Sequence, residues 1–172
     1  MRIGVISDTH GLLRPEALVA LQGCERIIHA GDIGKPQVLA ALAEIAPLDV
    51  IRGNIDSGDW ASELPEVLEL NHGGVRIYVL HDLKTLDIDP AARGIGVVIS
   101  GHSHKPQIQH RNEVLYLNPG SAGPRRFKLP ISLALLDIDN GKARAEMVLL
   151  ADRHYRAGAT WRSDHCPMRH SP

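Results

Sequence analysis

"RIGVISDTHG", residues 2–11, is a short aliphatic run that ends in a carboxylate and an imidazole. Because the run is rich in β-branched side chains and is followed by a turn, it predicts a buried strand. A helix that begins at Pro15 and a second strand at residues 26–30 come next. The pattern then repeats, with a helix at residues 35–45 and a strand at 48–51. This β-α-β-α-β order predicts a largely parallel, buried sheet in the first half of the chain.

The second half of the chain carries hairpin signals in place of long helices. The runs "VLEL" (67–70) and "VRIYVLH" (75–81) flank a turn rich in Asn and Gly, and "DIDNGKARA" (137–145) is typical of another hairpin. The pattern therefore predicts an α/β layered sandwich whose second half contains mixed or antiparallel strands. Further strand-like runs lie at residues 96–100, 106–111, 114–118, 131–138 and 143–150.

Length and hydrophobic content set the domain organisation. The chain has 172 residues, of which 44% are hydrophobic, and this is enough for one sizeable core. We expect one domain over residues 1–151. Residues 152–172 lack periodicity, so we expect them to form either a flexible, solvated tail or an extension that docks late.

Charge and composition exclude several classes of function. With a formal net charge of −1 and 3% aromatic residues, the chain has neither the cationic field nor the stacking surfaces typical of nucleic-acid-binding proteins. Cys24 and Cys166 lack the spacing of a disulfide framework or a zinc knuckle, so they fit a reducing compartment. No apolar run has the length of a signal peptide or a transmembrane helix. We therefore expect a cytoplasmic protein without a membrane partner, and the sequence leaves open whether it forms a homo-oligomer.

Polar side chains follow five of the predicted strands, at the point where each strand ends. In open α/β sheets, ligands bind in the crevice beyond the carboxyl ends of the strands, so we expect these side chains to lie close together. Where two of them are separated by one residue, both point the same way from an extended backbone. The residues concerned are Asp8, His10, Asp32, Asn54, His81, His102 and His104.

This set of side chains predicts a site for divalent metal ions. Two carboxylates, four imidazoles and one amide suit manganese, iron, zinc, nickel or cobalt, and they are too rich in nitrogen for a dedicated calcium or magnesium site. Seven ligands exceed what one such ion normally takes, so two ions that share one carboxylate are the economical arrangement. Two divalent ions against two carboxylates leave a surplus of about two positive charges, which would attract a phosphate ester.

The same residues lie in blocks that resemble, in order and spacing, the five signature blocks of the calcineurin-like metallophosphoesterases. With "NPGS" (118–121) and the short length, they are most similar to the small bacterial and archaeal phosphodiesterase branch of that superfamily. The resemblance covers about residues 1–150 and implies a sandwich of two mixed β-sheets flanked by helices. The blocks are "SDTHG" (7–11), "AGD" (30–32), "GNID" (53–56), His81 and "GHSH" (101–104).

By this resemblance, the chain is a metal-dependent phosphoric ester hydrolase with two divalent ions. Manganese is the first expectation, and iron, zinc, nickel or cobalt are alternatives. Asp32 would bridge the ions, and Asn54 would offer a neutral oxygen after Gly53, which lets the backbone turn. A hydroxide between the ions would attack the phosphorus of a small phosphoester, so no separate protein base is required. The first ion would be held by Asp8, His10, Asp32 and His104, and the second by Asp32, Asn54, His81 and His102.

Candidate substrate contacts are Asn54 and three residues that follow the last block. Asn118 and Ser121 either contact substrate or support the metal ligands, and the sequence favours neither role. Arg125 belongs to a run of cationic residues that ends at Lys128. Such a run can contact an anion, although it is more often a solvated face.

Three positions bear on how the leaving group departs and how the ligands are supported. Many members of the superfamily carry a His directly after the Asn of the third block, where it protonates the leaving group or contacts phosphate, and here that residue is Ile55. Either Asp56 or a metal-bound water supplies the proton, or assistance is absent. Asp56 is also a candidate to support the ligands. Asp82 stands where Gly is frequent, and it either supports a ligand or faces solvent.

Other functions stay open at the level of sequence. The superfamily includes a scaffold subunit of an endosomal coat, in which the metal site is degraded and the surface binds other proteins, whereas here every expected ligand is present. A phosphomonoesterase or a dinucleoside polyphosphate hydrolase is the alternative among enzymes. Bacterial hydrolases of the latter kind carry an additional Asp-Arg-Gly element, which "GDIGKPQ" (31–37) lacks. We expect His29 to be a hydrogen-bonded core or supporting histidine. The irregular spacing of four tail residues does not favour a further metal site: His154, His165, Cys166 and His170.

Overall fold

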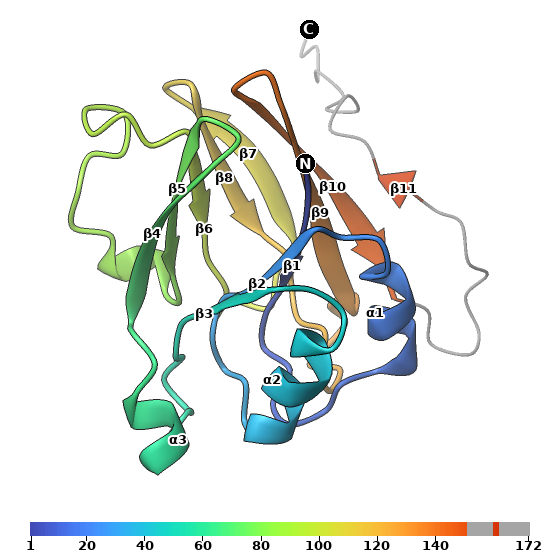
Figure 1. The fold of residues 1–172 in the computed structure, drawn as a ribbon. Coiled ribbons are helices and arrows are strands. Elements are labelled where there is room, and N and C mark those ends of the chain that lie inside the picture. The colour runs from blue at the N-terminus through green and yellow to red at the C-terminus, as the bar shows by residue number, and fades with distance from the viewer. Residues whose placement is uncertain (151–159, 162–172) are drawn as a thin grey trace, which may run out of the picture.

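The computed structural model of the chain describes residues 1–150 and 160–161, and these form two β-sheets that pack face to face (Figure 1). The first sheet has the strand order β11-β10-β9-β1-β2-β3. Its β1, β2 and β3 run parallel, whereas β9, β10 and β11 pair antiparallel. The strands are β1 (Arg2–Ile6), β2 (Arg26–His29), β3 (Leu48–Val50), β9 (Ser132–Asp139), β10 (Lys142–Leu149) and β11 (Thr160–Trp161).

The second sheet has the order β4-β5-β6-β8-β7. Its central strands β5, β6 and β8 are parallel, and an antiparallel strand lies at each edge. The strands are β4 (Val67–His72), β5 (Val75–Leu80), β6 (Val97–Ile99), β7 (Gln107–Arg111) and β8 (Val114–Asn118).

The main core lies between the two sheets and is aliphatic. Alternate side chains of each strand, such as Ile3 and Val5 of β1, face Ile77, Val97 and Leu115 of the second sheet, and all of these are buried. Because side chains alternate across a strand, the intervening residues form separate cores on the outer faces.

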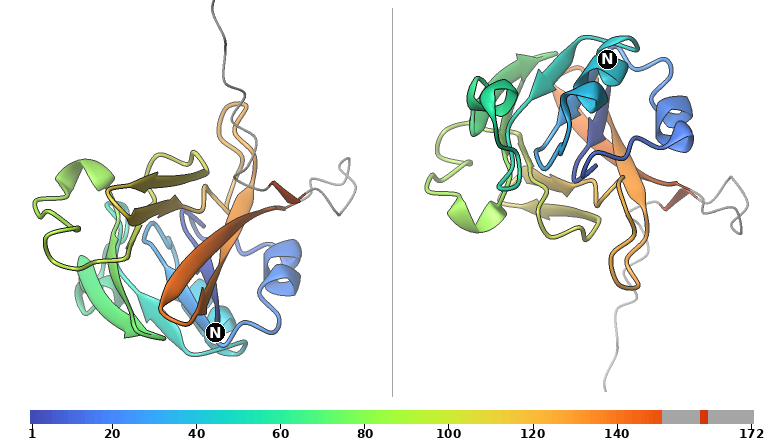
Figure 2. Two further views of the ribbon diagram at one scale, coloured as in Figure 1. Left: turned by 90° about the horizontal axis from the view of Figure 1, so that it is seen from above. Right: turned by 90° about the horizontal axis from the view of Figure 1, so that it is seen from below.

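Two α-helices cover the outer face of the first sheet. α1 (Pro15–Ala20) and α2 (Pro36–Ala43) each begin with a proline in the first turn, where its missing N–H and fixed φ favour the start of a helix. The outer face of the second sheet is covered by the segment around the short helix η1 (Leu83–Thr85), which lies on the opposite side of the molecule from α1 (Figure 2). The remaining helix, α3 (Asp59–Ser62), directly precedes β4.

The predicted architecture of two mixed sheets with helices is confirmed. The sequence did not predict α3 and η1, because three or four residues are too few to show helical periodicity. Of the predicted tail at 152–172, the described part is Thr160–Trp161, which pairs with β10. The tail histidines and Cys166 lie outside the described residues, and the domain boundary at residue 151 stays a prediction.

The carboxyl ends of the parallel strands of both sheets lie at the same end of the sandwich. Asp8 follows β1, Asp32 follows β2, His81 follows β5 and His102 follows β6. Among the described residues, no helix combines the length and the apolar content needed to cross a membrane.

Candidate metal centre

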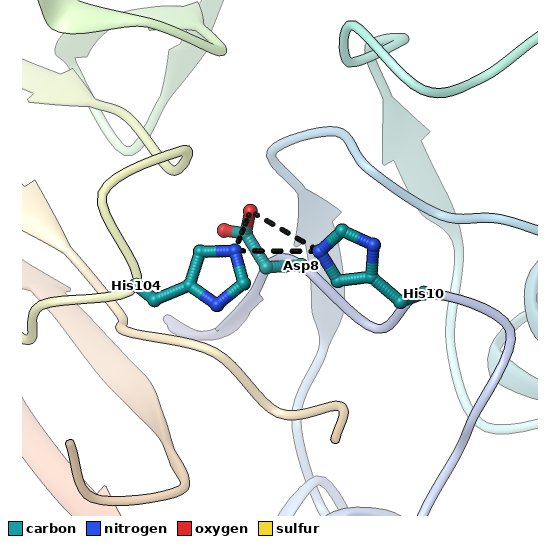
Figure 3. A group of neighbouring side chains, drawn as sticks. All are labelled: Asp8, His10 and His104. Atoms are coloured by element: carbon teal, nitrogen blue, oxygen red, sulfur yellow. Dashed lines mark hydrogen bonds and ion pairs between the residues drawn. The ribbon is translucent and has the colours of Figure 1, made fainter. Parts of the chain in front are cut away.

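Five of the seven predicted ligands form two groups that share Asp8. In the first group, His104 Nε2 lies 3.2 Å from Asp8 Oδ1, and His10 Nε2 lies 4.0 Å from the same oxygen (Figure 3). The two imidazole nitrogens are 3.3 Å apart. The second group consists of Asp8, Asp32 and His81, with 3.2 Å between His81 Nε2 and Asp32 Oδ1. Each group is small enough for its ligand atoms to bind one ion.

Asp32 lies between the groups, with one oxygen toward a histidine of each. Its Oδ1 faces His81, and its Oδ2 is 3.8 Å from His10 Nε2. Asp32 therefore lies near a histidine of each group. Asp8 is itself a member of both groups.

Asn54 and His102 lie beside these groups and contact each other. Asn54 Oδ1 is 3.0 Å from His102 Nδ1, and the ring of His102 stands edge-on to that of His81 with 5.2 Å between centroids. Both residues are exposed, and neither belongs to the two groups of converging ligand atoms. They form the open side of the site.

The backbone is left-handed at five of the predicted ligands. This conformation is uncommon for residues other than glycine and costs roughly 1 kcal/mol or more at each position. Strain of this kind concentrates at functional sites, because the surrounding fold must hold the residues in place. The φ values are 54° at Asp8, 46° at His10, 54° at Asp32, 65° at His102 and 57° at His104.

Two glycines make room for the carboxylates. A Cβ at Gly53 would collide with the carboxylate and backbone of Asp32, and one at Gly101 would collide with Ser7 and Asp8. The φ of Gly53 is outside the left-handed region. The chain does turn at Gly53, because the Asp56 N–H donates to the Gly53 carbonyl at 3.4 Å, and close approach to Asp32 is what requires glycine there.

Hydrogen bonds fix one oxygen of Asp8 and leave the other free. The Ser7 hydroxyl and the His102 backbone N–H both donate to Asp8 Oδ2, at 2.7 and 3.1 Å. Asp8 Oδ1 is buried, makes no hydrogen bond to any described residue and faces His104. An unpaired buried carboxylate oxygen is costly unless a cation binds it.

The buried Nε2 of His81 also lacks a hydrogen-bond partner that the described residues could supply. Its Nδ1 lies 2.7 Å from the carbonyl oxygen of Ala30, which can only accept, so Nδ1 carries the hydrogen. Nε2 of the neutral ring then directs a lone pair at Asp32 Oδ1, and this buried nitrogen has no hydrogen-bond partner among the described residues. A proton or a metal ion between the two atoms would turn this repulsion into attraction. The donor set of carboxylate and imidazole groups therefore fits a divalent metal ion.

Burial and the opposite charges set the protonation of these groups. Burial alone would raise the pKa of Asp32, but His81 and the N–H of Ile55 hold it below its usual value. Burial opposes the charged form of His81, yet Asp32 and the Ala30 carbonyl raise its pKa. The pKa of His10 is lowered, chiefly by burial. Asp32 is therefore ionised near neutral pH, as a metal ligand must be.

Comparison with known proteins identifies the family. Residues 1–141 match the model of the calcineurin-like phosphoesterase superfamily domain. The chain belongs to that superfamily. A probable metallophosphoesterase of Methanothermobacter thermautotrophicus is 36% identical over 160 residues, which cover 86% of this chain and 92% of the relative. The phosphodiesterase YfcE of Escherichia coli is 28% identical over 171 residues, which cover 81% and 89% of the two chains.

The fold matches solved structures of the same architecture. Vps29 of Chaetomium thermophilum superposes with a TM-score of 0.79 and 22% identity, over 94% of this chain and 96% of that one. The prediction that this chain is a metallophosphoesterase is confirmed by the family match and the curated relatives.

The predicted substrate contacts occupy different positions around this metallophosphoesterase site. Asn118 is buried, and its amide donates to the Gly101 carbonyl at 2.7 Å and to Ser103 Oγ at 3.1 Å. Ser121 Oγ donates to the backbone oxygen of Asp8 at 2.9 Å. These bonds support the ligand loops, and substrate binding by either residue stays a prediction. Arg125 is exposed on the loop that follows.

Ile55 and Asp56 directly follow the predicted ligand Asn54. Ile55 is 41% exposed, and its N–H donates to Asp32 Oδ1 at 3.2 Å. Asp56 is buried and accepts two backbone N–H groups, from Gly34 and Gly53, each at 2.8 Å. Asp56 therefore ties two ligand loops together, and Ile55 offers only an apolar side chain.

An open cleft of about 330 Å³ adjoins Asn54, His81 and His102. Asp82 lines it, with Oδ2 3.8 Å from His102 Nε2, and accepts the N–H of Lys84 at the start of η1. The volume is at the lower end for ligand sites, so it suits a small ester group.

The sequence did not identify Ser7 as a ligand-supporting residue, although its place inside "SDTHG" was the available signal.

Proposed function

We propose that this chain is a phosphodiesterase that uses two divalent ions, with manganese as the first candidate metal. The observation that carries the proposal is the convergence of buried ligand atoms, two of which, Asp8 Oδ1 and His81 Nε2, have no hydrogen-bond partner among the described residues. Such atoms are costly to bury unless a donor or a cation binds them, and divalent ions would bind both. The buried free thiol of Cys24 agrees with a reducing, cytoplasmic location.

In this proposal Asp32 bridges the two ions, because its two oxygens face histidines of different groups. Asp8, His10 and His104 complete one ion site, and Asn54, His81 and His102 complete the other. When bound, divalent ions lower the pKa of water and neutralise charge on phosphoryl oxygens. Ser7 holds Asp8 in position, and the Ala30 carbonyl fixes the tautomer of His81.

The residues next to Asn54 do not provide a general acid. Ile55 has no proton to donate, and both carboxylate oxygens of Asp56 are occupied by backbone N–H groups. Esters with a stabilised aryl oxide as leaving group should therefore react faster than alkyl esters. General-acid assistance is typically worth about 10²–10⁴-fold, which is the scale of the expected difference.

Hydrolysis by metal-loaded protein tests the proposal. Methyl p-nitrophenyl phosphate, a diester, should be cleaved only when manganese is restored after chelation, and faster than the monoester p-nitrophenyl phosphate. Asp8→Asn should abolish this activity, whereas Asp137→Asn, which alters a carboxylate paired with Arg2 on the surface, should retain it. Undiminished hydrolysis after chelation would contradict metal dependence, and a preference for the monoester would favour a phosphomonoesterase.

A further inference from the structure

The loop formed by residues 124–128, "PRRFK", combines positive charge with an exposed aromatic ring. Phe127 is the only phenylalanine of the chain, and 90% of it is exposed. Arg125, Arg126 and Lys128 surround it and are also exposed. A single exposed apolar residue needs no explanation, but a large aromatic ring at this exposure among cations is unusual.

The backbone of Phe127 is strained as well. Its φ is 54°, in the left-handed region that bulky residues avoid. The ring faces solvent, so its burial does not offset the conformational free energy of the left-handed backbone. A conformation of this kind, kept without a packing benefit, suggests selection for binding.

The base of this 124–128 loop is attached to the loop that carries Asp8 and His10. Ser121 Oγ donates to the Asp8 carbonyl at 2.9 Å, and the Ala122 N–H donates to the Ser7 carbonyl at 3.1 Å. A Cβ at Gly123 would collide with the carbonyls of Asp8 and Thr9, so the two segments are in direct contact. The loop projects from the end of the sandwich between β8 and β9 (Figure 2).

Chain length also places the cations of the loop near the metal centre. Arg126 is three residues after Gly123, which lies against the Asp8 and Thr9 carbonyls, so the Cα of Arg126 is within about 11 Å of that contact. The cleft at Asn54 and His102 adjoins the other metal group. The cleft and the 124–128 loop therefore adjoin different ligand residues, so the two ester groups of a diester at the centre can be directed to different surfaces.

We propose that Phe127 stacks on an aromatic ring carried by the non-leaving ester group of the substrate, while Arg126 contacts its phosphoryl oxygens. This inference rests on the proposed function and names the class of substrate: a phosphodiester with an aryl or nucleobase ring on the side of the 124–128 loop. An anionic membrane is the other surface that cations and an exposed ring suit. The attachment of the loop to the Asp8 segment favours substrate.

Three diesters with the same p-nitrophenolate leaving group test this inference. Their non-leaving groups are methyl, phenyl and 5′-thymidyl, so the phenyl and thymidyl esters separate an aryl ring from a nucleobase. In manganese-loaded protein, Phe127→Ala should lower kcat/KM for at least one ring-bearing ester about 5- to 150-fold, mainly through KM, as expected for loss of one stacking contact. The methyl ester should change less than about twofold. Phe127→Trp should restore the ring-bearing esters, and Val19→Ala, a truncation at another exposed apolar residue, should change none.

Binding provides a second readout that does not depend on turnover. Calorimetry on the manganese-loaded protein should give a lower Kd for diphenyl phosphate than for dimethyl phosphate, and Phe127→Ala should remove the difference. Unchanged kinetics in Phe127→Ala, or an equal loss for all three diesters, would overturn the inference. Loss of sedimentation with phosphatidylserine vesicles at unchanged kcat/KM would assign the loop to a membrane instead. If the wild type cleaves none of the diesters, the proposed function fails, and calorimetry still decides the role of Phe127.

Discussion

His29 should make the folded protein sensitive to acid, because its hydrogen bonds require a neutral ring. The side chain is fully buried at the end of β2. Thr9 Oγ1 donates its only hydrogen to the Ile33 carbonyl at 3.0 Å, so it accepts from His29 Nε2, also at 3.0 Å. His29 Nδ1 accepts the N–H of Gly31 at 3.3 Å. A second proton on the ring would place two donors face to face, and burial adds to this penalty.

Burial accordingly lowers the pKa of His29 from 6.5 to about 4. The unfolded chain takes up a proton as pH falls through 6.5, whereas the folded chain does so only near pH 4. Because the unfolded state binds more protons in this window, the free energy of unfolding falls as pH falls. Between pH 7 and pH 4 the loss from this one residue is about 3 kcal/mol.

Urea denaturation at pH 7, 6, 5 and 4, in chelator, measures this effect. His29→Gln removes the titrating group and keeps an amide that can donate to Thr9. The variant should be less stable at pH 7, yet its free energy of unfolding should fall by about 3 kcal/mol less than that of the wild type on acidification. Parallel pH dependences for the two proteins would refute the assignment of a neutral, buried His29.

Three further outcomes are expected at the metal centre. Ser7→Ala should weaken manganese affinity about 10- to 100-fold in a binding titration, because it removes the hydrogen bond that fixes the carboxylate of Asp8. Ser57→Ala, at an exposed serine, should leave the affinity unchanged. Equal affinities in the two variants would show that Ser7 does not support Asp8. Asp32→Asn should lower diester hydrolysis far more than Asp82→Asn, and similar modest losses would mean that Asp32 is not shared. Ile55→His should accelerate esters with poor leaving groups selectively and flatten the dependence of rate on leaving-group pKa. A shallow dependence in the unmodified protein would show that an acid already acts.

The sequence predicted the positions of the ligands well because they follow strands. Aliphatic runs define the strands, and parallel strands bring their carboxyl ends together, so Asp8, Asp32 and His81 were expected to converge. The spacing of Asp8 from His10 was expected to place both side chains on the same side of an extended backbone. Their left-handed φ values show a different local reason, a tight loop at each ligand.

Contacts between distant segments could not be predicted from local pattern. Ser121 and Asp8 are 113 residues apart, and only the folded chain shows that a hydroxyl holds the backbone of the ligand loop. Asn54 and His102 are 48 residues apart, and their contact could not be predicted from local sequence for the same reason. Local periodicity reports which face of an element is buried, but it does not report which loops meet.

The metal content of the reconstituted protein tests the central claim most directly. Protein dialysed to saturation with manganese, freed of unbound metal and analysed by mass spectrometry should contain about two ions per chain, as a dinuclear centre requires. Asp8→Asn should lower that ratio, because Asp8 contributes to both groups of ligand atoms. A wild-type protein that hydrolyses the diester fully at one ion per chain, or with none, would contradict the account.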